Sequence, residues 1–400
     1  MNLETLKSTL NYILDNNLKL MEKGLPKTAV NIIGDAGTGK TSIVEQIAQE
    51  RNAKFIKLSL AQMEETGDFL GLPVKMYAMI SPEGEEIWVA EKTIEPYIKL
   101  NYTLCASCEP RMDYAVPAWV PLHEDGEVIL LLDDYTRANN IILQGIMNLV
   151  QCGEFGSWKL PKKCHIILTS NFDNGSYNLN SVDSAMTSRM LNFTADFDVK
   201  VFAKWAENVG MRNEFINFAI LNPDIFNSKN LSVNARNYTM FANACSGIKD
   251  LEKGLPLINN IAKGSFGEEE YISGKFCTFI NNRLDKLPSP EKMLHGDWQE
   301  VHADLTEAVY RNGVYRSDIS SVLTLRFTNF ASKFMRESTS KTKAKDIIDR
   351  CSKIIHCEDT GEVLLSNDHI FLLIRELVAQ NPGSMAKLLT DPKIRAKIMD

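Results

Sequence analysis

The sequence lacks any run of apolar residues long enough to cross a membrane. A spanning helix needs about 18–20 consecutive apolar residues, whereas the runs Val128–Leu132 and Ile370–Ile374 are five residues long. The amino terminus, Met1-Asn2-Leu3-Glu4, also lacks the basic segment and apolar core of a secretory signal. We therefore expect a cytoplasmic protein.

An excess of positive charge is missing too. With 44 Lys and Arg against 51 Asp and Glu, the formal net charge is −7. This balance argues against a protein whose whole surface coats nucleic acid. Apolar residues make up 44% and charged residues 24% of the 400 residues, which is typical of globular chains and argues against disorder or a rod.

Cysteine is sparse. Eight cysteines are too few for a disulfide framework in a chain of this length, and a cytoplasmic protein would keep them reduced. Cys105 and Cys108 have a metal-like spacing, and Cys351 and Cys357 flank His356. Zinc normally needs four ligands, and no second pair lies at zinc-ribbon distance. We expect ordinary thiols at both places.

Helix and strand patterns alternate over the first half of the chain. Apolar residues recur at helical spacing over residues 2–22, which predicts an amphipathic helix. From residue 29 to about 195, apolar runs alternate with helical stripes, which predicts an α/β fold with a parallel sheet and flanking helices. Helical patterns dominate afterwards. We expect an α/β domain over 1–195, a helical domain over 196–286 and a mostly helical extension over 287–400.

A glycine-rich loop follows the first predicted strand. Its residues match G-x-x-x-x-G-K-[ST] at every fixed position. The glycines let backbone N–H groups wrap a phosphate, the lysine contacts the β and γ phosphates, and the hydroxyl after it faces Mg²⁺. The predicted ATP-binding residues are Gly34, Asp35, Ala36, Gly37, Thr38, Gly39, Lys40, Thr41 and Ser42.

Two acidic residues follow the apolar strand Val128–Leu132. A carboxylate at the end of a buried strand is costly without a cation, and Mg²⁺ bound with a nucleotide supplies one. Asp133 is the predicted metal-side carboxylate, together with Thr41. Asp134 stands where a general base would polarise the attacking water.

The glycine-rich loop and six segments, one of which contains the acidic pair, resemble the AAA+ ATPases, in particular their MoxR-like and dynein-related branch. The resemblance covers roughly residues 20–245, and its pieces occur in the family's order. The segments are Asp68–Pro73, Tyr114–Pro121, Asp133–Ala138, Thr169–Asn171, Val182–Arg189 and Asn234–Arg236. The resemblance implies a P-loop sheet followed by a helical lid, ATP and Mg²⁺ as ligands, and a homo-oligomeric ring, most commonly a hexamer.

The resemblance also implies roles for single residues. Asn171 would orient the attacking water and the γ-phosphate, and Arg189 would reach the nucleotide of a neighbouring subunit. Arg236 would contact the γ-phosphate from the lid, and Arg137 is a further candidate for contacts between subunits. Family members usually carry Glu where this chain has Asp134. The shorter side chain leaves open slow hydrolysis or a nucleotide switch.

Two segments resemble insertions of this branch. Residues Gly153–Lys163 resemble its hairpin before the sensor strand, and residues 61–100 contain a polar turn at Ser81–Gly84. In related rings such segments line the central channel and touch the substrate. The alternative is that they only cap the sheet.

The carboxyl-terminal third is locally basic. Residues 311–345 hold eight basic and two acidic residues, a net charge of +6, with Tyr315, Phe327, Phe330 and Phe334 interleaved. This pattern fits an amphipathic helix with solvated basic positions, or a docking site for nucleic acid or an acidic partner.

Taken together, the sequence predicts an ATP-hydrolysing ring protein with MoxR-like remodelling or assembly of a protein partner. The alternatives are a phage- or bacterium-encoded nucleic-acid motor or replication accessory ATPase, and a nucleotide-gated scaffold with weak turnover.

Overall fold

The computed structural model describes residues 1–400 except 64, 123, 156–157, 173–183, 228–232, 268–269, 338–340, 358–362, 391, 393 and 396–400. The chain forms two compact units, Met1–Asp196 and Phe197–Asp400. Within the described residues, no helix has the length and apolar character needed to span a membrane.

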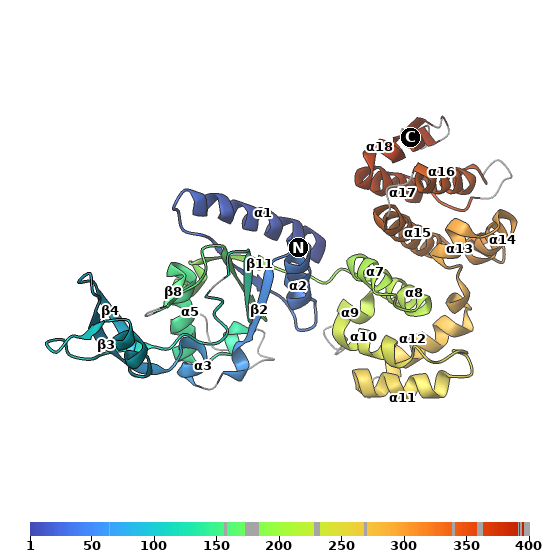
Figure 1. Ribbon diagram of the computed structural model, residues 1–400. Helices are drawn as coiled ribbons and strands as arrows, with labels where there is room; N and C mark the ends of the chain where they lie inside the picture. Colours follow the sequence, from blue (N-terminus) through green and yellow to red (C-terminus); the bar gives the residue numbers. More distant parts are fainter. Residues whose placement is uncertain are drawn as a thin grey trace. The chain divides into compact units, whose positions relative to one another are not determined.

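The first unit is built on a five-stranded sheet (Figure 1). All four neighbouring pairs of strands are parallel. In spatial order the strands are β11 (Met190–Thr194), β1 (Ala29–Ile33), β10 (Cys164–Ser170), β7 (Val128–Asp133) and β2 (Lys54–Ser59). The predicted α/β class is therefore confirmed.

Helices cover both faces of this sheet, and β7 shows why. Ile129 and Leu131 share one hydrophobic cluster with α1 (Leu3–Glu22) and α2 (Lys40–Glu50). Val128, Leu130 and Leu132 share the opposite cluster with α5 (Asn140–Cys152). A strand buried on both faces needs apolar residues at every position, which explains the continuous run. Two short helices, α3 (Thr66–Leu70) and α6 (Ser184–Thr187), contribute residues to the same cluster as α5.

A second, antiparallel sheet projects from the first unit (Figure 1). Its strands lie between β2 and β7 in the sequence. Its strands are β3 (Pro73–Ile80), β4 (Glu86–Ala90), β5 (Thr103–Leu104) and β6 (Arg111–Tyr114), with α4 (Ile94–Lys99) between β4 and β5. The polar turn predicted at Ser81–Gly84 connects β3 and β4, and the Ser81 hydroxyl accepts hydrogen bonds from the N–H groups of Glu83 and Glu85.

One expectation about cysteine is wrong. Cys105 and Cys108, which follow β5, form a disulfide with their Cα atoms 5.4 Å apart. The chain turns tightly here, with Cys108 N–H 3.4 Å from the Cys105 carbonyl oxygen, and this turn brings both sulfur atoms within bonding range. The other six cysteines are free thiols.

The predicted hairpin before β10 contains two short strands, β8 (Glu154–Phe155) and β9 (Trp158–Lys159). Its central residues, including Gly156, lie outside the described residues. The Trp158 indole is buried, and its Nε1 donates to the Leu70 carbonyl oxygen at 3.1 Å. The hairpin is thus anchored to the end of α3. Single-turn 3-10 helices occur at Leu60–Gln62, Glu91–Thr93 and Tyr135–Arg137.

The second unit is mostly helical and holds two hydrophobic clusters. The first is formed by α7 (Val199–Asn208), α8 (Asn213–Leu221), α9 (Asp224–Asn227), α10 (Ala235–Ala244), α11 (Leu255–Phe266) and α12 (Glu270–Asn281). The second is formed by α13 (Pro290–His295), α14 (Trp298–Val309), α15 (Ser317–Glu337), α16 (Lys341–His356), α17 (Asn367–Gln380) and α18 (Pro382–Met385). The described residues of this unit also form 3-10 helices at Leu284–Lys286 and Ala386–Thr390 and the strand pair β12 (Tyr310–Arg311) and β13 (Val314–Tyr315). The division at residue 287 stays a prediction.

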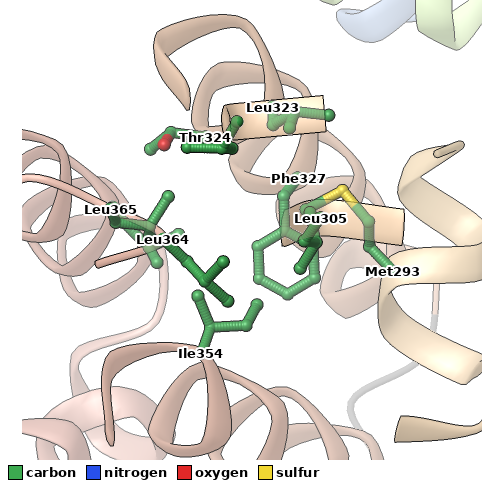
Figure 2. A pocket seen from close by; sticks show the side chains of 10 residues that line it. Met293, Leu305, Leu323, Thr324, Phe327, Ile354, Leu364 and Leu365 are labelled. Carbon is green, nitrogen blue, oxygen red and sulfur yellow. The ribbon is translucent and has the colours of Figure 1, made fainter. Parts of the chain in front are cut away.

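A small cavity lies inside the second cluster (Figure 2). Leu305, Phe327, Ile354 and Leu364 are among the side chains that line it. The one hydroxyl in the lining, on Thr324, donates to the Ser320 carbonyl oxygen at 2.7 Å within the same helix. This hydroxyl is therefore already paired, and we interpret the cavity as a small gap in the packing of the hydrophobic cluster.

The basic segment over 311–345 is more than one helix, and its Arg326 is buried and not solvated. It spans the β12–β13 pair, α15 and the start of α16. Arg326 is buried, and its Nε lies 2.9 Å from Glu207 Oε1 on α7. Phe327 is buried, and Phe330 and Phe334 pack against the same cluster. Glu207 and Asn217, more than a hundred residues earlier in the chain, accept hydrogen bonds from Arg326 and offset the cost of burying its charge.

Candidate nucleotide-binding site

The glycine-rich loop connects β1 to α2. Gly37 and Gly39 have φ values of +77° and +96°, a left-handed region that glycine enters without steric cost. At Gly34, a Cβ atom would lie 2.7 Å from the Ala195 carbonyl oxygen, so a side chain cannot be placed there. The first turn of α2 has no side-chain cap and no acidic residue. The N–H groups at a helix amino terminus, together with the helix dipole, suit an anion.

Lys40 is buried at the start of α2. Its Nζ donates to the carbonyl oxygens of Gly34 and Asp35 at 2.7 and 2.9 Å. The same Nζ lies 3.0 Å from Oδ1 of Asn171, which follows β10. The structure therefore brings together the predicted phosphate-binding lysine and the predicted sensor asparagine, although 131 residues separate them in sequence.

Asp133 ends β7 and accepts three polar contacts. Its Oδ1 accepts hydrogen bonds from Thr41 Oγ1 at 2.8 Å and from Thr169 Oγ1 at 2.6 Å. Its Oδ2 lies 2.9 Å from Lys57 Nζ. Burial alone would raise the pKa of Asp133, but the hydrogen bonds from Thr169, Lys57 and Thr41 and the charge of Lys57 outweigh burial and lower the pKa.

This environment fits a magnesium ligand set. Asp133 is ionised at neutral pH, because its pKa lies below the ordinary carboxyl value. Magnesium prefers oxygen ligands and is usually bound by one or two protein groups together with nucleotide phosphates. The Thr41 hydroxyl and the Asp133 carboxylate are such groups, 2.8 Å apart. Within the described residues, no group of three or more His, Cys, Asp or Glu side chains could hold a metal ion.

Asp134 directly follows β7 in an unusual backbone conformation. Its φ is +51° and its ψ is 45°, the left-handed helical region. Asp tolerates this region better than most residues. Its backbone N–H donates to Thr169 Oγ1 at 3.0 Å, and its Oδ1 accepts from Asn171 Nδ2 at 3.2 Å. The predicted base and sensor residues are therefore in contact.

The three predicted arginines belong to other segments of the chain. Arg189 precedes β11 and is exposed, with its Nε 3.0 Å from Gln151 Oε1 and a further guanidinium hydrogen bond to the Ala185 carbonyl oxygen. The first part of its predicted motif, Val182 and Asp183, lies outside the described residues. Arg137 ends the 3-10 helix after Asp134. Arg236 belongs to the second unit, in the first turn of α10.

Motif analysis assigned no role to two residues of the site. Thr169 contacts both acidic residues, and Lys57 contacts Asp133. Thr169 lies two residues before Asn171, so its place at the end of a buried strand is a signal that could have identified it. Lys57 enters the site only through the pairing register of β2 and β7, which places Ser59 opposite Asp133.

Parts of this chain are similar to known proteins. Residues 30–92 match the model of the family described as "ATPase family associated with various cellular activities (AAA)". Midasin from Dictyostelium discoideum is 38% identical over 73 residues, which cover 17% of this chain and 1% of midasin. A mutant of RuvB from Thermotoga maritima covers 84% of this chain and 77% of its own, with 12% identity and a TM-score of 0.29.

The parallel sheet and the glycine-rich loop between β1 and α2 thus form a P-loop fold. The residues that match this family model lie within the first unit.

Proposed function

We propose that this chain is a cytoplasmic, ATP-hydrolysing AAA+ protein of the MoxR-like branch that forms a ring and remodels or assembles a protein partner. One observation carries the proposal. Side chains from three separate segments meet at one edge of the parallel sheet: Lys40, Thr41, Asp133, Asp134 and Asn171. These are the groups that phosphoryl transfer to water requires.

Nucleotide binding uses the loop and Lys40. The N–H groups of the loop and of the first turn of α2 would donate to phosphate oxygens. Lys40 exchanges its contacts with the Gly34 and Asp35 carbonyl oxygens for the β and γ phosphates. Thr41 and Asp133 would hold magnesium, which when bound withdraws negative charge from the phosphates.

Water activation falls to Asp134 and Asn171. Asp134 accepts the proton of the attacking water as general base. The Asn171 amide donates to the same carboxylate at 3.2 Å, so it fixes the direction in which the carboxylate points. Because Asp134 is one methylene shorter than the family's usual Glu, the water must lie closer to the backbone of β7.

Completion of the site requires a second subunit. The guanidinium of Arg189 is exposed at the surface of the first unit. In a hexameric ring it would reach a neighbour's nucleotide and stabilise charge on the transferring phosphoryl group. Arg236 belongs to the second unit and would contact the γ-phosphate. The angle of the lid would then depend on which nucleotide is bound.

The competing function is a nucleic-acid motor or replication accessory ATPase. Its sequence support was the basic segment over 311–345, but Arg326 is buried and Phe327, Phe330 and Phe334 belong to the packing of the second unit. We therefore favour a protein partner. A salt-sensitive gel shift with single- and double-stranded DNA would reverse this preference.

The proposed function is tested by nucleotide binding and phosphate release. Lys40→Ala should abolish tight binding of Mg·ATP, because the β and γ phosphates lose their counter-charge. Asp134→Asn should keep binding and lose turnover. Lys54→Ala, which removes a half-exposed lysine paired with Glu124 at 3.2 Å, is the control and should change neither. Unaltered hydrolysis in Asp134→Asn would remove Asp134 from the role of base.

A further inference from the structure

A lysine outside the recognised motifs lies against the carboxylate that we assign to magnesium. Lys57 Nζ is 2.9 Å from Asp133 Oδ2. The other oxygen, Oδ1, accepts hydrogen bonds from the hydroxyls of Thr41 and Thr169. Of these three donors to one carboxylate, Lys57 alone carries a formal charge. It therefore occupies the side of Asp133 that the hydroxyls leave open.

The sheet explains how the lysine reaches this place. β2 is an edge strand and runs parallel to β7, with Lys57 opposite Leu131 and Ser59 opposite Asp133. The Lys57 side chain is 41% exposed, whereas the Asp133 side chain is 17% exposed. Lys57 can therefore swing into solvent on its flexible stem, while Asp133 is held by two part-buried hydroxyl hydrogen bonds.

We propose that Lys57 is the resident counter-ion of Asp133 and lowers the affinity of this carboxylate for a divalent cation. Lys57 thereby weakens the dependence of nucleotide binding on magnesium. The inference rests on the proposed function, because it concerns the metal that accompanies ATP. Like charges near one carboxylate repel each other, so Lys57 leaves Asp133 Oδ2 when the carboxylate serves a metal. Partly exposed ion pairs are weak, so Lys57 adjusts metal affinity and does not block it.

The test compares ATP affinity with magnesium and with EDTA by isothermal titration calorimetry. The quantity of interest is the ratio of the two dissociation constants, EDTA over magnesium. In Lys57→Met this ratio should rise by about two- to fivefold, the effect expected for release of a partly exposed ion pair. In Lys57→Arg, which keeps the charge, the ratio should not rise. Lys54→Met removes a charge from the same strand without touching the site and should leave the ratio unchanged.

The outcomes separate the inference from the proposed function. If wild type binds ATP but Lys57→Met leaves the ratio unchanged or lowers it, the inference is overturned and the proposed function stands. If wild type binds ATP under neither condition, the proposed function fails and the inference fails with it. Thermal unfolding of each variant checks the fold, and Lys57→Gln replaces Lys57→Met should the latter not fold.

Discussion

At the scale of single residues, the backbone conformation of Asp134 bears on which acidic residue this position can hold. The residue follows a buried strand in a left-handed conformation. Its N–H donates a hydrogen bond to Thr169, and its carboxylate accepts one from Asn171. Asp and Asn adopt this conformation at lower cost than longer side chains do. The backbone thus gives a physical reason for the shorter acid at this position: the turn itself favours aspartate.

Asp134→Glu should therefore reduce both stability and turnover. Glu tolerates positive φ less well than Asp does, which lowers the free energy of unfolding by about 1 kcal/mol. The carboxylate of the longer side chain also moves away from Asn171. For a unit of this size such a loss lowers the melting temperature by about 2–4 °C. Differential scanning calorimetry and phosphate release would measure the two effects. Asp134→Asn is the matched control for the backbone, because Asn also tolerates this region, and it should melt near wild type. Faster turnover in Asp134→Glu with unchanged stability would contradict this account.

At the scale of elements, the central strands carry buried polar groups whose ionisation affects stability. His165 on β10 has a fully buried side chain. Burial lowers its pKa from 6.5 to about 4, and the charges of Lys27 and Arg51 act in the same direction, against a smaller opposing effect of Asp15. Glu127 Oε1 lies 3.2 Å from Nε2, but this carboxylate already pairs with Arg51 at 2.7 Å. The native state therefore holds His165 neutral.

Acid should destabilise the first unit through His165. Because the folded pKa lies below the unfolded value, the unfolded chain binds the proton first, and stability falls as pH drops from 6.5 towards 4. A shift of this size corresponds to about 3 kcal/mol. Urea unfolding at pH 7.5 and pH 4.5 would measure the loss. His165→Gln should show a smaller loss over this interval, whereas His295→Gln, at an exposed position on α13, should behave as wild type. Equal pH dependence in wild type and His165→Gln would rule out this role.

Packing of helices α7 and α15 in the second unit depends on a buried ion pair. The Arg326 and Glu207 side chains are 3% and 8% exposed. Arg326 also donates to Asn217 Oδ1 at 2.7 Å and to the side chain of Asn213. Burial raises the pKa of Glu207 even beside Arg326, and both the charge of Arg326 and its hydrogen bond oppose that effect.

Arg326→Met should destabilise the second unit by about 3–5 kcal/mol, because it leaves a buried carboxylate without its partner. The double variant Arg326→Met with Glu207→Met should recover most of this loss. Arg316→Met breaks a more exposed pair with Asp318 near the start of α15 and should cost less than about 1 kcal/mol. Chemical denaturation measures all three. Similar small losses in both single variants would show that burial of the pair is unimportant.

At the scale of the whole molecule, the first unit was the more predictable part. The run Val128–Leu132 and the loop Gly34–Thr41 mark a buried strand and a strand-to-helix turn through local sequence alone. Local patterns do not encode pairing register, so the sequence could not place Lys57 beside Asp133 or pair β3 with both β4 and β6. Arg326 appeared solvated for the same reason, because its partners lie on α7 and α8.

In the proposed function the site depends on assembly, since Arg189 would act on another subunit's nucleotide. The most direct test mixes two inactive variants and measures phosphate release. Lys40→Ala subunits cannot use their own site but still present Arg189. Arg189→Ala subunits bind ATP but lack the arginine, whose loss should reduce the rate by about 10³–10⁵. Mixed rings, verified by native mass spectrometry to contain both variants, should regain part of the activity that neither variant has alone. No recovery in such rings, or full activity of a dilute monomer, would contradict the account.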